Sequence, residues 1–394
     1  MNKTSSNSVV RIGIAGFGTA GRSFLPAIEA HPGFQLVAVA DPVATVREEI
    51  AREQGVPGYA TVQELLAHPG LDAVYIATPT RLHEEQVLLA ARAGKHVLVE
   101  KPMAVNASHA LPMVEAAEKA GIVFLVGHSH GYDLPVLEMR KVIESGRLGR
   151  VRMVNSWDYT DWMCRPRRDD ELDETLGGGV TYRQGAHQID VIRLLCGGRT
   201  RSVRAKTYSW DAQKKGIGAH TLFMDFEDGV GAMASYNGYG YFSSVDICFN
   251  VTESGFHQES GVVTRARMQA AANQSPEDVL KAKQERARKT SYGPAPHQPM
   301  FGMTIVSCER GDIRQSANGL LIYSDAGMEE IALPLDKSPR DLVLMELYDA
   351  ITGRARPVHS GRWGLANLEV CDAAIESSAS GREILLKHQV GLPS

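Results

Sequence analysis

Short apolar runs alternate with amphipathic helical patterns from Val9 to about Gly127. The runs are apolar throughout rather than at every second position: "VVRIGIAG", "FQLVAVAD", "LDAVYIATP", "KHVLVEKP" and "IVFLVG". Continuous apolar strands separated by helices are typical of a parallel sheet that helices cover on both faces. The sequence therefore predicts an α/β doubly wound parallel sheet over residues 9–127, preceded by a disordered N-terminal tail over residues 1–8.

The pattern changes after Gly127, and residues 128–394 are predicted to form a second, α+β domain. A helix near Val136–Ser145 and the strand "RVRMVNSWDY" precede strand-like stretches without intervening helices, at 201–210, 219–228, 229–238 and 245–254. These stretches indicate an open, mostly antiparallel sheet. Residues 255–300 are charged and then rich in Pro and Gly, which indicates an insertion. An exposed apolar sheet face predicts a homodimer or homotetramer.

Charge and cysteine content narrow the function. The 42 basic and 46 acidic residues nearly balance, and no block of like charge stands out, so nucleic acid is not expected as a partner. The five cysteines are scattered without a CxxC pair, which argues against disulfides and structural zinc and favours a reduced, cytoplasmic setting. No apolar run is long enough for a bilayer, so we expect a small-molecule ligand and neither a membrane nor a metal.

A glycine motif predicts a dinucleotide site. "GFGTAG" follows the strand "RIGIA" and opens a helical pattern, the context in which GxGxxG holds a pyrophosphate in a Rossmann fold. Asp41 ends the next strand, where a carboxylate can accept hydrogen bonds from the ribose hydroxyls and would repel a 2′-phosphate. NAD is therefore expected rather than NADP. Alternatively, Asp41 only opens the turn before Pro42, and Thr78 and Pro79 only form a turn. The predicted cofactor contacts are Gly16, Phe17, Gly18, Thr19, Ala20, Gly21, Asp41, Thr78, Pro79, His83, Glu100 and Lys101.

Three motifs in order, "GFGTAG", "EKP" at 100–102 and "GGG" followed by "HxxD", resemble the Gfo/Idh/MocA family of glucose-fructose oxidoreductases and inositol dehydrogenases. The resemblance implies an NAD-dependent dehydrogenase in which Lys101 and His187 flank the reacting carbon. Elementary chemistry agrees, because oxidation of an alcohol needs a base, and histidine titrates in the useful range. Asp190 shares a helical face with His187 and could orient it or contact substrate. Without the resemblance, His187 would be interpreted as an ordinary core histidine. The glycines at 177–179 are expected to let the backbone approach a ligand.

One position departs from that family. Members that act on polyols commonly carry aspartate four residues before the histidine, whereas this chain has Arg183, whose guanidinium suits a carboxylate. Arg165, Arg167 and Arg168 in "RPRRDDELDE" could add positive charge, or Arg167 and Arg168 could pair with the acidic half of their own segment. We therefore expect a carboxylated cyclic alcohol as substrate, contacted by Arg183, Asp190, Arg165, Arg168, His130 and Trp162.

Residues 307–320 and 361–378, with "RPR" and "YRQGAHQID", are similar to bacterial phthalate 4,5-cis-dihydrodiol dehydrogenases. That similarity implies oxidation of the phthalate diol to dihydroxyphthalate in the catabolism of aromatic compounds. The alternatives are an inositol, sugar or uronic-acid dehydrogenase and, in another class, a non-catalytic NAD-binding sensor.

Overall fold

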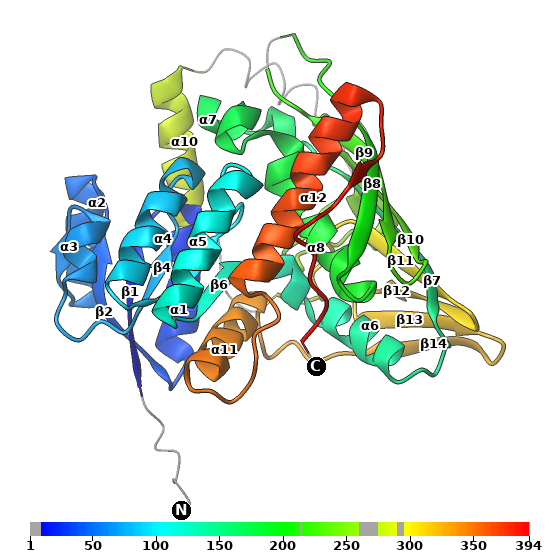
Figure 1. Cartoon of the computed structure of the whole chain (residues 1–394), viewed down its shortest axis with the longest axis horizontal. Helices are drawn as coiled ribbons and strands as arrows, with labels where there is room; N and C mark the ends of the chain where they lie inside the picture. Colours follow the sequence, from blue (N-terminus) through cyan, green and yellow to red (C-terminus); the bar gives the residue numbers. More distant parts are fainter. Residues whose placement is uncertain (1–8, 213–214, 260–274, 290–294, 394) are drawn as a thin grey trace, which may run out of the picture.

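The computed structural model describes residues 9–212, 215–259, 275–289 and 295–393. Within them, a parallel sheet of six strands is built in the order β3-β2-β1-β4-β5-β6 (Figure 1). The strands are β1 (Val10–Ala15), β2 (Phe34–Ala40), β3 (Gly58–Tyr59), β4 (Ala73–Ile76), β5 (His96–Glu100) and β6 (Phe124–Gly127). The predicted doubly wound sheet is confirmed. The N-terminal tail lies outside the described residues.

Helices cover both faces of this sheet. They are α1 (Thr19–Ala30), α2 (Ala44–Gln54), α3 (Val62–Leu66), α4 (His83–Arg92) and α5 (Ala107–Ala120). Side chains of α1 and α2 pack with Ile12 and Ile14 of β1, whereas those of α3, α4 and α5 pack with Val74 and Val97 on the opposite face. A capping box marks the start of α3: the Thr61 side chain accepts from the Glu64 amide, and the Glu64 side chain accepts from the Thr61 amide.

The second sheet has nine strands in the described residues, ordered β14-β13-β12-β11-β7-β10-β9-β8-β15. They are β7 (Val151–Tyr159), β8 (Thr200–Tyr208), β9 (Ala219–Phe226), β10 (Gly231–Asn237), β11 (Met303–Cys308), β12 (Gly311–Gln315), β13 (Gly319–Ser324), β14 (Gly327–Ala332) and β15 (Ile384–Leu385). β7 and β10 run parallel, and the other neighbours are antiparallel. The open, mostly antiparallel sheet is confirmed, although β11 to β15 were not predicted.

The predicted strand at 245–254 is wrong. Residues Ser244–Ile247 form a single 3-10 turn that the Ser243 side chain caps by accepting from the Val245 amide. Phe249 and Asn250 then adopt left-handed backbone angles, with φ of 59° and 58°, which no strand can contain. The segment therefore turns back and carries its next residues towards the cavity described below.

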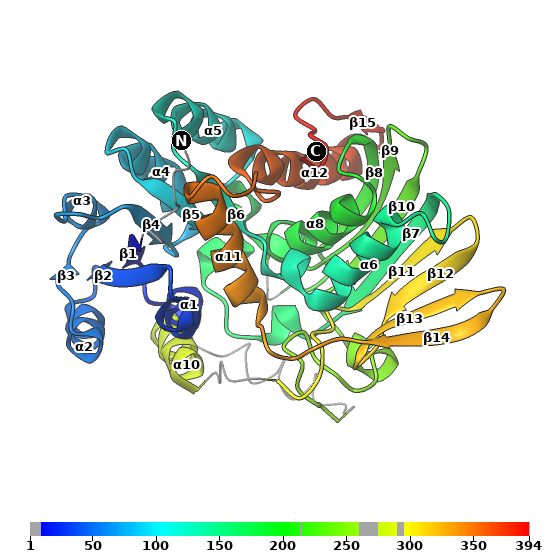
Figure 2. The ribbon, with the colours of Figure 1, turned by 90° about the horizontal axis from the view of Figure 1, so that it is seen from below.

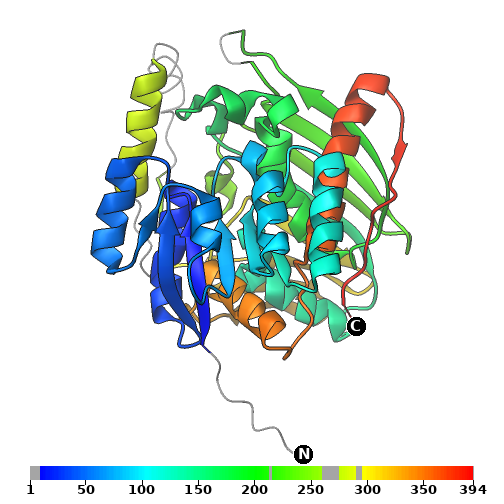
Figure 3. The ribbon, with the colours of Figure 1, turned by 60° about the vertical axis from the view of Figure 1, so that its left-hand side comes forward.

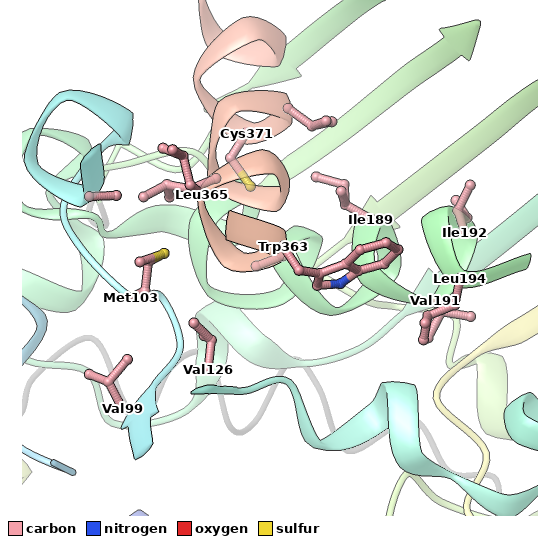
Figure 4. Packing of buried hydrophobic residues seen from close by; sticks show 14 of the residues in the cluster. Val99, Met103, Val126, Ile189, Val191, Ile192, Leu194, Trp363, Leu365 and Cys371 are labelled. Carbon is pink, nitrogen blue, oxygen red and sulfur yellow. The ribbon is translucent and has the colours of Figure 1, made fainter. Parts of the chain in front are cut away.

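Helices connect the two sheets. They are α6 (Leu134–Glu144), α7 (Asp169–Leu172), α8 (Ala186–Leu195), α11 (Pro339–Ile351) and α12 (Gly361–Ser380). Side chains of α6, α8 and α12 share one apolar core, whereas α11 packs in the core on the other face of the first sheet. Trp363, Leu365 and Cys371 of α12 pack between Ile189 of α8 and Val126 of β6 (Figure 4). Figure 2 shows α11 and α12 lying against the first sheet, although they come from the end of the chain. The boundary predicted at residue 127 stays a prediction.

The insertion predicted at 255–300 contains one described helix, α10 (Pro276–Lys289), and residues 260–274 and 290–294 lie outside the described residues. α10 stands beside α1 (Figures 1 and 2). On the second sheet, Met153, Phe223, Met233 and Tyr323 remain exposed. Association through this face stays a prediction. No described helix is long and apolar enough to cross a membrane.

Candidate active site

A cavity of about 860 Å³ opens at the carboxyl ends of the parallel strands. One side of its wall comes from the loops after β1, β2, β4 and β5, the edge where open α/β sheets bind ligands. The opposite side comes from residues 165–168, from Arg183 and Glu253, and from Ala282 and Lys283 of α10. In Figure 3, α10 stands next to the first sheet, on the side of the molecule where this cavity lies.

The three glycines of the first loop have different tasks. Gly16 has φ of 89°, a conformation that favours glycine, and makes the tight turn. A Cβ on Gly21 would lie 1.9 Å from the Gly16 carbonyl oxygen, so Gly21 allows α1 to pack on the turn and does not itself line the cavity. A Cβ on Gly18 would meet no atom within 4 Å. Gly18 therefore leaves open space in front of the α1 N-terminus, where a pyrophosphate is favoured.

Asp41 is fixed at the same edge by two backbone amides. Its Oδ2 accepts from the Phe17 amide at 2.9 Å, and its Oδ1 accepts from the Val43 amide at 2.9 Å. Each carboxylate oxygen can accept a second hydrogen bond, so the residue can still bind ribose hydroxyls. The turn-forming role and the cofactor role predicted for Asp41 are therefore compatible. Phe17, Thr19 and Ala20 line the cavity beside it.

The loops after β4 and β5 are joined through His83. Its Nε2 lies 2.9 Å from the Thr78 carbonyl and its Nδ1 lies 3.1 Å from the Pro102 carbonyl, and burial lowers its pKa to about 4. The ring is therefore neutral near pH 7, donates its one N–H to one of the two carbonyls, and packs between the two loops. Thr78, Pro79 and Glu100 line the cavity as predicted contacts, and Glu100 accepts a hydrogen bond from Tyr75 at 2.6 Å.

Lys101 follows β5 directly and reaches across to the second half of the chain. Its Nζ donates to the Arg183 carbonyl at 2.9 Å. Burial lowers the pKa of Lys101 to about 8, and the negative charge of Glu100 opposes part of that shift. The amine thus stays mostly protonated at neutral pH and is poised to release its proton slightly above it.

His187 lies behind the cavity wall among aromatic rings. Its ring centroid is 4.6 Å from that of His130, 5.4 Å from Phe301 and 6.4 Å from His128. Burial lowers its pKa well below the ordinary value, and the positive charge of Lys101 adds to the shift. Its Nδ1 is buried and has no hydrogen-bond partner in the described part of the chain. The imidazole is therefore neutral near pH 7 and able to accept a proton.

Arg183 and His187 do not share one α-helical face, contrary to the prediction. Residues Thr181–Gly185 form a π-helical turn, and α8 begins only at Ala186. His187 is not among the residues that line the cavity. Arg183 lines the cavity and donates from Nη1 to the Thr80 hydroxyl at 3.3 Å. Its Nε is buried without a partner among the described residues.

The glycines at 177–179 serve backbone packing, not ligand approach. A Cβ on Gly178 would lie 2.6 Å from the Asp173 backbone, and one on Gly179 would lie 3.2 Å from the Ile217 carbonyl. Neither they nor Gly177 line the cavity. They allow the chain to fold tightly into the π-helical turn that presents Arg183.

Acidic neighbours or an aromatic ring hold the other arginines of the cavity wall. Arg165 donates to Asp161 at 2.8 Å and lies 3.8 Å from a Glu253 oxygen. Arg168 makes two bonds to Asp170, at 2.8 and 3.0 Å. Arg167 stacks 4.0 Å above the Trp162 ring and donates to the Trp162 carbonyl. For Arg168, the predicted pairing within its own segment is thus present.

The predicted contact of Asp190 with substrate is corrected by the structure, because Asp190 does not line the cavity. It is fully buried, accepts from Trp363 Nε1 at 2.6 Å and from Asn367 Nδ2 at 2.8 Å, and lies 3.4 Å from His359 Nε2. Every residue of α8 is buried, so the "HxxD" spacing places Asp190 against α12 and not against substrate. Asp190 therefore stabilises the core beneath the site.

Two further predicted substrate contacts also lie away from the cavity wall. Trp162 is 2% exposed and packs in a small apolar cluster. His130 stacks on Phe301 at 4.3 Å and pairs with Asp133 at 3.0 Å, which raises the pKa of His130. Both rings support residues of the site and do not line the cavity.

Glu253 and Lys283 also line the cavity, and no sequence pattern pointed to either of them. Glu253 lay in a segment predicted as a strand, and Lys283 lay in an insertion of open function. Lys283 pairs with Glu171 and so joins α10 to α7. Among the described residues, no group of three or more His, Cys, Asp or Glu side chains could hold a metal ion.

A parallel sheet with this glycine turn, an acidic residue after β2 and a cavity shared with an open second sheet define a dinucleotide-dependent oxidoreductase. Residues 10–128 match the family described as "Oxidoreductase family, NAD-binding Rossmann fold", and residues 136–255 match the "GFO/IDH/MocA C-terminal domain". The chain belongs to the GFO/IDH/MocA family of oxidoreductases. It is a dehydrogenase whose cofactor is NAD, and Gly18, Asp41 and the α1 N-terminus fit that cofactor.

Relatives span almost the whole chain. A 1-carboxy-3-chloro-3,4-dihydroxycyclohexa-1,5-diene dehydrogenase of Comamonas testosteroni is 36% identical over 375 residues, which cover 93% of this chain and 94% of the relative. Inositol 2-dehydrogenase of Rhizobium meliloti is 26% identical over 95% of this chain and 98% of its own length. A crystal structure of a Bordetella bronchiseptica protein assigned as a dehydrogenase is 38% identical, with a TM-score of 0.89, and covers 96% of this chain and 100% of its own.

Proposed function

We propose that this dehydrogenase oxidises a ring cis-dihydrodiol that carries a carboxylate. The observation that carries the proposal is Arg183, whose buried Nε has no partner among the described residues although it belongs to the cavity wall. A buried guanidinium favours an anionic partner, and a carboxylate matches its planar geometry. The Comamonas relative acts on a ring with one carboxyl group and two neighbouring hydroxyls, which supports the same substrate class.

Lys101 and His187 are the residues we propose for the chemistry. The Lys101 ammonium binds the oxygen of the reacting hydroxyl and stabilises negative charge as it develops there. His187 does not line the cavity in this structure, so its proposed role, acceptance of the hydroxyl proton, requires its ring to turn towards the bound substrate. NAD, when bound, accepts the hydride from the same carbon. The product is a ring ketone that tautomerises: the remaining sp3 carbinol carbon loses its proton, the ketone oxygen takes one up, and the aromatic diol forms. The gain of aromaticity favours oxidation.

The phthalate 4,5-cis-dihydrodiol predicted from the sequence belongs to this class. An inositol, sugar or uronic acid is the alternative substrate. A polyol offers hydroxyls and no carboxylate, so it would leave Arg183 without an anionic partner, and a uronic acid would supply a carboxylate without the diene.

NADH formation by the purified protein separates these possibilities. The panel contains a carboxylated cis-dihydrodiol, the uncarboxylated cis-dihydrodiol, inositol, glucose and a uronic acid, each supplied with NAD. We expect turnover of the carboxylated diol, with kcat/KM lowered about 10- to 100-fold in Arg183→Ala, the cost of one charge-assisted contact. Arg92→Ala, on the exposed end of α4, is the matched control. Selective turnover of inositol or glucose would contradict the proposal.

A further inference from the structure

The cationic side chains of the cavity wall differ in the partners that they already have. Arg165 has Asp161 and Glu253, Arg168 has Asp170, and Lys283 has Glu171. Arg167 is held on the Trp162 ring. Arg183 alone among these guanidiniums has a buried Nε for which the described residues provide no acceptor. An anion bound at Arg183 would therefore accept from this buried Nε without displacing an existing acceptor.

Glu253 adds a negative charge to the same wall. Its side chain is 39% exposed, lines the cavity with Arg183 and Lys101, and lies 3.8 Å from Arg165 Nη1. Its negative charge opposes the lowering of the Lys101 pKa and adds to the raised pKa of His130. An anion in this part of the cavity would be repelled by Glu253, whereas a hydroxyl could donate to it.

We propose that the site admits one carboxylate, held by Arg183, and that Glu253 excludes a second one and accepts a hydroxyl of the substrate instead. This inference rests on the proposed function and narrows it. The substrate is then a monocarboxylated cis-dihydrodiol of the benzoate type, not the phthalate diol with carboxylates on neighbouring ring carbons.

The reason is the balance of charge around the ring. A second carboxylate on the neighbouring carbon must find its own cation, because the two carboxylates repel one another when both are ionised. Arg165 and Arg168 could supply that cation only by giving up Asp161 or Asp170, which exchanges one ion pair for another without net gain. Arg167 already stacks on the Trp162 ring and donates to the Trp162 carbonyl. The carboxylate left behind would then face the substrate, and juxtaposed like charges are unfavourable.

The experiment compares two substrates in matched enzymes. Wild type, Glu253→Gln and the control Glu376→Gln, an exposed position on α12 away from the cavity, are assayed with NAD and either the benzoate cis-dihydrodiol or the phthalate 4,5-cis-dihydrodiol. Binding of benzoate and phthalate to the protein saturated with NAD is measured by calorimetry as a readout independent of turnover. Glutamine keeps the size and one acceptor oxygen of Glu253, removes its charge and replaces the second oxygen by an NH2 donor.

We expect wild type and Glu376→Gln to prefer the monocarboxylate by at least about tenfold in kcat/KM and in affinity, the scale of one unfavourable charge contact. In Glu253→Gln the preference should fall to within about threefold. Equal use of the two diols by wild type would overturn this inference and leave the proposed function standing. A preference that persists in Glu253→Gln overturns the role of Glu253. Failure to oxidise either carboxylated diol refutes the proposed function, and the inference falls with it.

Discussion

His359 is the cation on which the buried network under the active site depends. It is 2% exposed, with Nε2 3.4 Å from Asp190 and Nδ1 3.3 Å from Glu346, and its ring stacks on Tyr132. Burial by itself would lower its pKa, but the two carboxylates outweigh burial and raise that pKa to about 10. The imidazolium is therefore the charged form throughout the neutral range.

His359→Gln keeps a polar side chain of similar length and removes the positive charge. It leaves Asp190 and Glu346 buried without their cation, which typically costs about 3–5 kcal/mol in the free energy of unfolding. The rise of the pKa from 6.5 to about 10 corresponds to a stabilisation of the same size, about 5 kcal/mol.

The sign of the pH dependence follows from the raised pKa. Because the folded protein holds this proton more tightly than the unfolded chain, the stabilisation is complete below pH 6.5 and is lost as pH rises towards 10. Urea denaturation of wild type and His359→Gln at pH 6 and pH 9 should show a gap that narrows by about 3 kcal/mol. His109→Gln, on the exposed surface, is the control and should stay within about 0.5 kcal/mol of wild type. A gap that is absent at pH 6, or that stays constant to pH 9, would refute the role of His359.

Two glycine substitutions distinguish an effect on folding stability from an effect on NAD binding, and a third substitution tests the proposed chemistry. Gly21→Ala places a Cβ against the Gly16 carbonyl and should lower the unfolding free energy by at least about 1 kcal/mol, measured in urea, whereas Gly18→Ala should fold as wild type and lose NAD affinity in a fluorescence titration. Normal NAD binding by Gly18→Ala would place the pyrophosphate elsewhere. Lys101→Met should reduce kcat about 10²- to 10⁴-fold with little change in NAD affinity, and a variant that keeps most of its turnover would remove Lys101 from the chemistry.

The parallel sheet could be predicted because its information is local. Each strand is apolar throughout, and the glycine turn, Asp41 and Lys101 follow strand ends that necessarily meet at one edge of the sheet. Strands β11 to β14 lack such signals: they are short, half-exposed and joined by tight turns, so their pattern resembles that of loops.

The errors at the site have a common cause in tertiary structure. Asp190 was assigned from helical spacing, but spacing cannot tell which side of an entirely buried helix faces a ligand. The π-helical turn at Thr181–Gly185 replaces the α-helix that was predicted to carry Arg183 together with His187, and no pattern in the sequence marks it. Glu253 reaches the cavity only because Phe249 and Asn250 reverse the chain just before it.

The return of α11 to the first sheet has a consequence for biosynthesis. Val343, Leu344 and Leu347 of this helix complete the apolar face that Ile12, Ile14 and Leu98 form on the earliest strands. At about 5–20 residues per second, a ribosome needs on the order of 10–40 s to make the stretch between the end of β6 and the start of α11. During that interval the nascent nucleotide-binding half exposes the part of this face that α1 and α2 leave uncovered. The face is completed only after α11 has been synthesised.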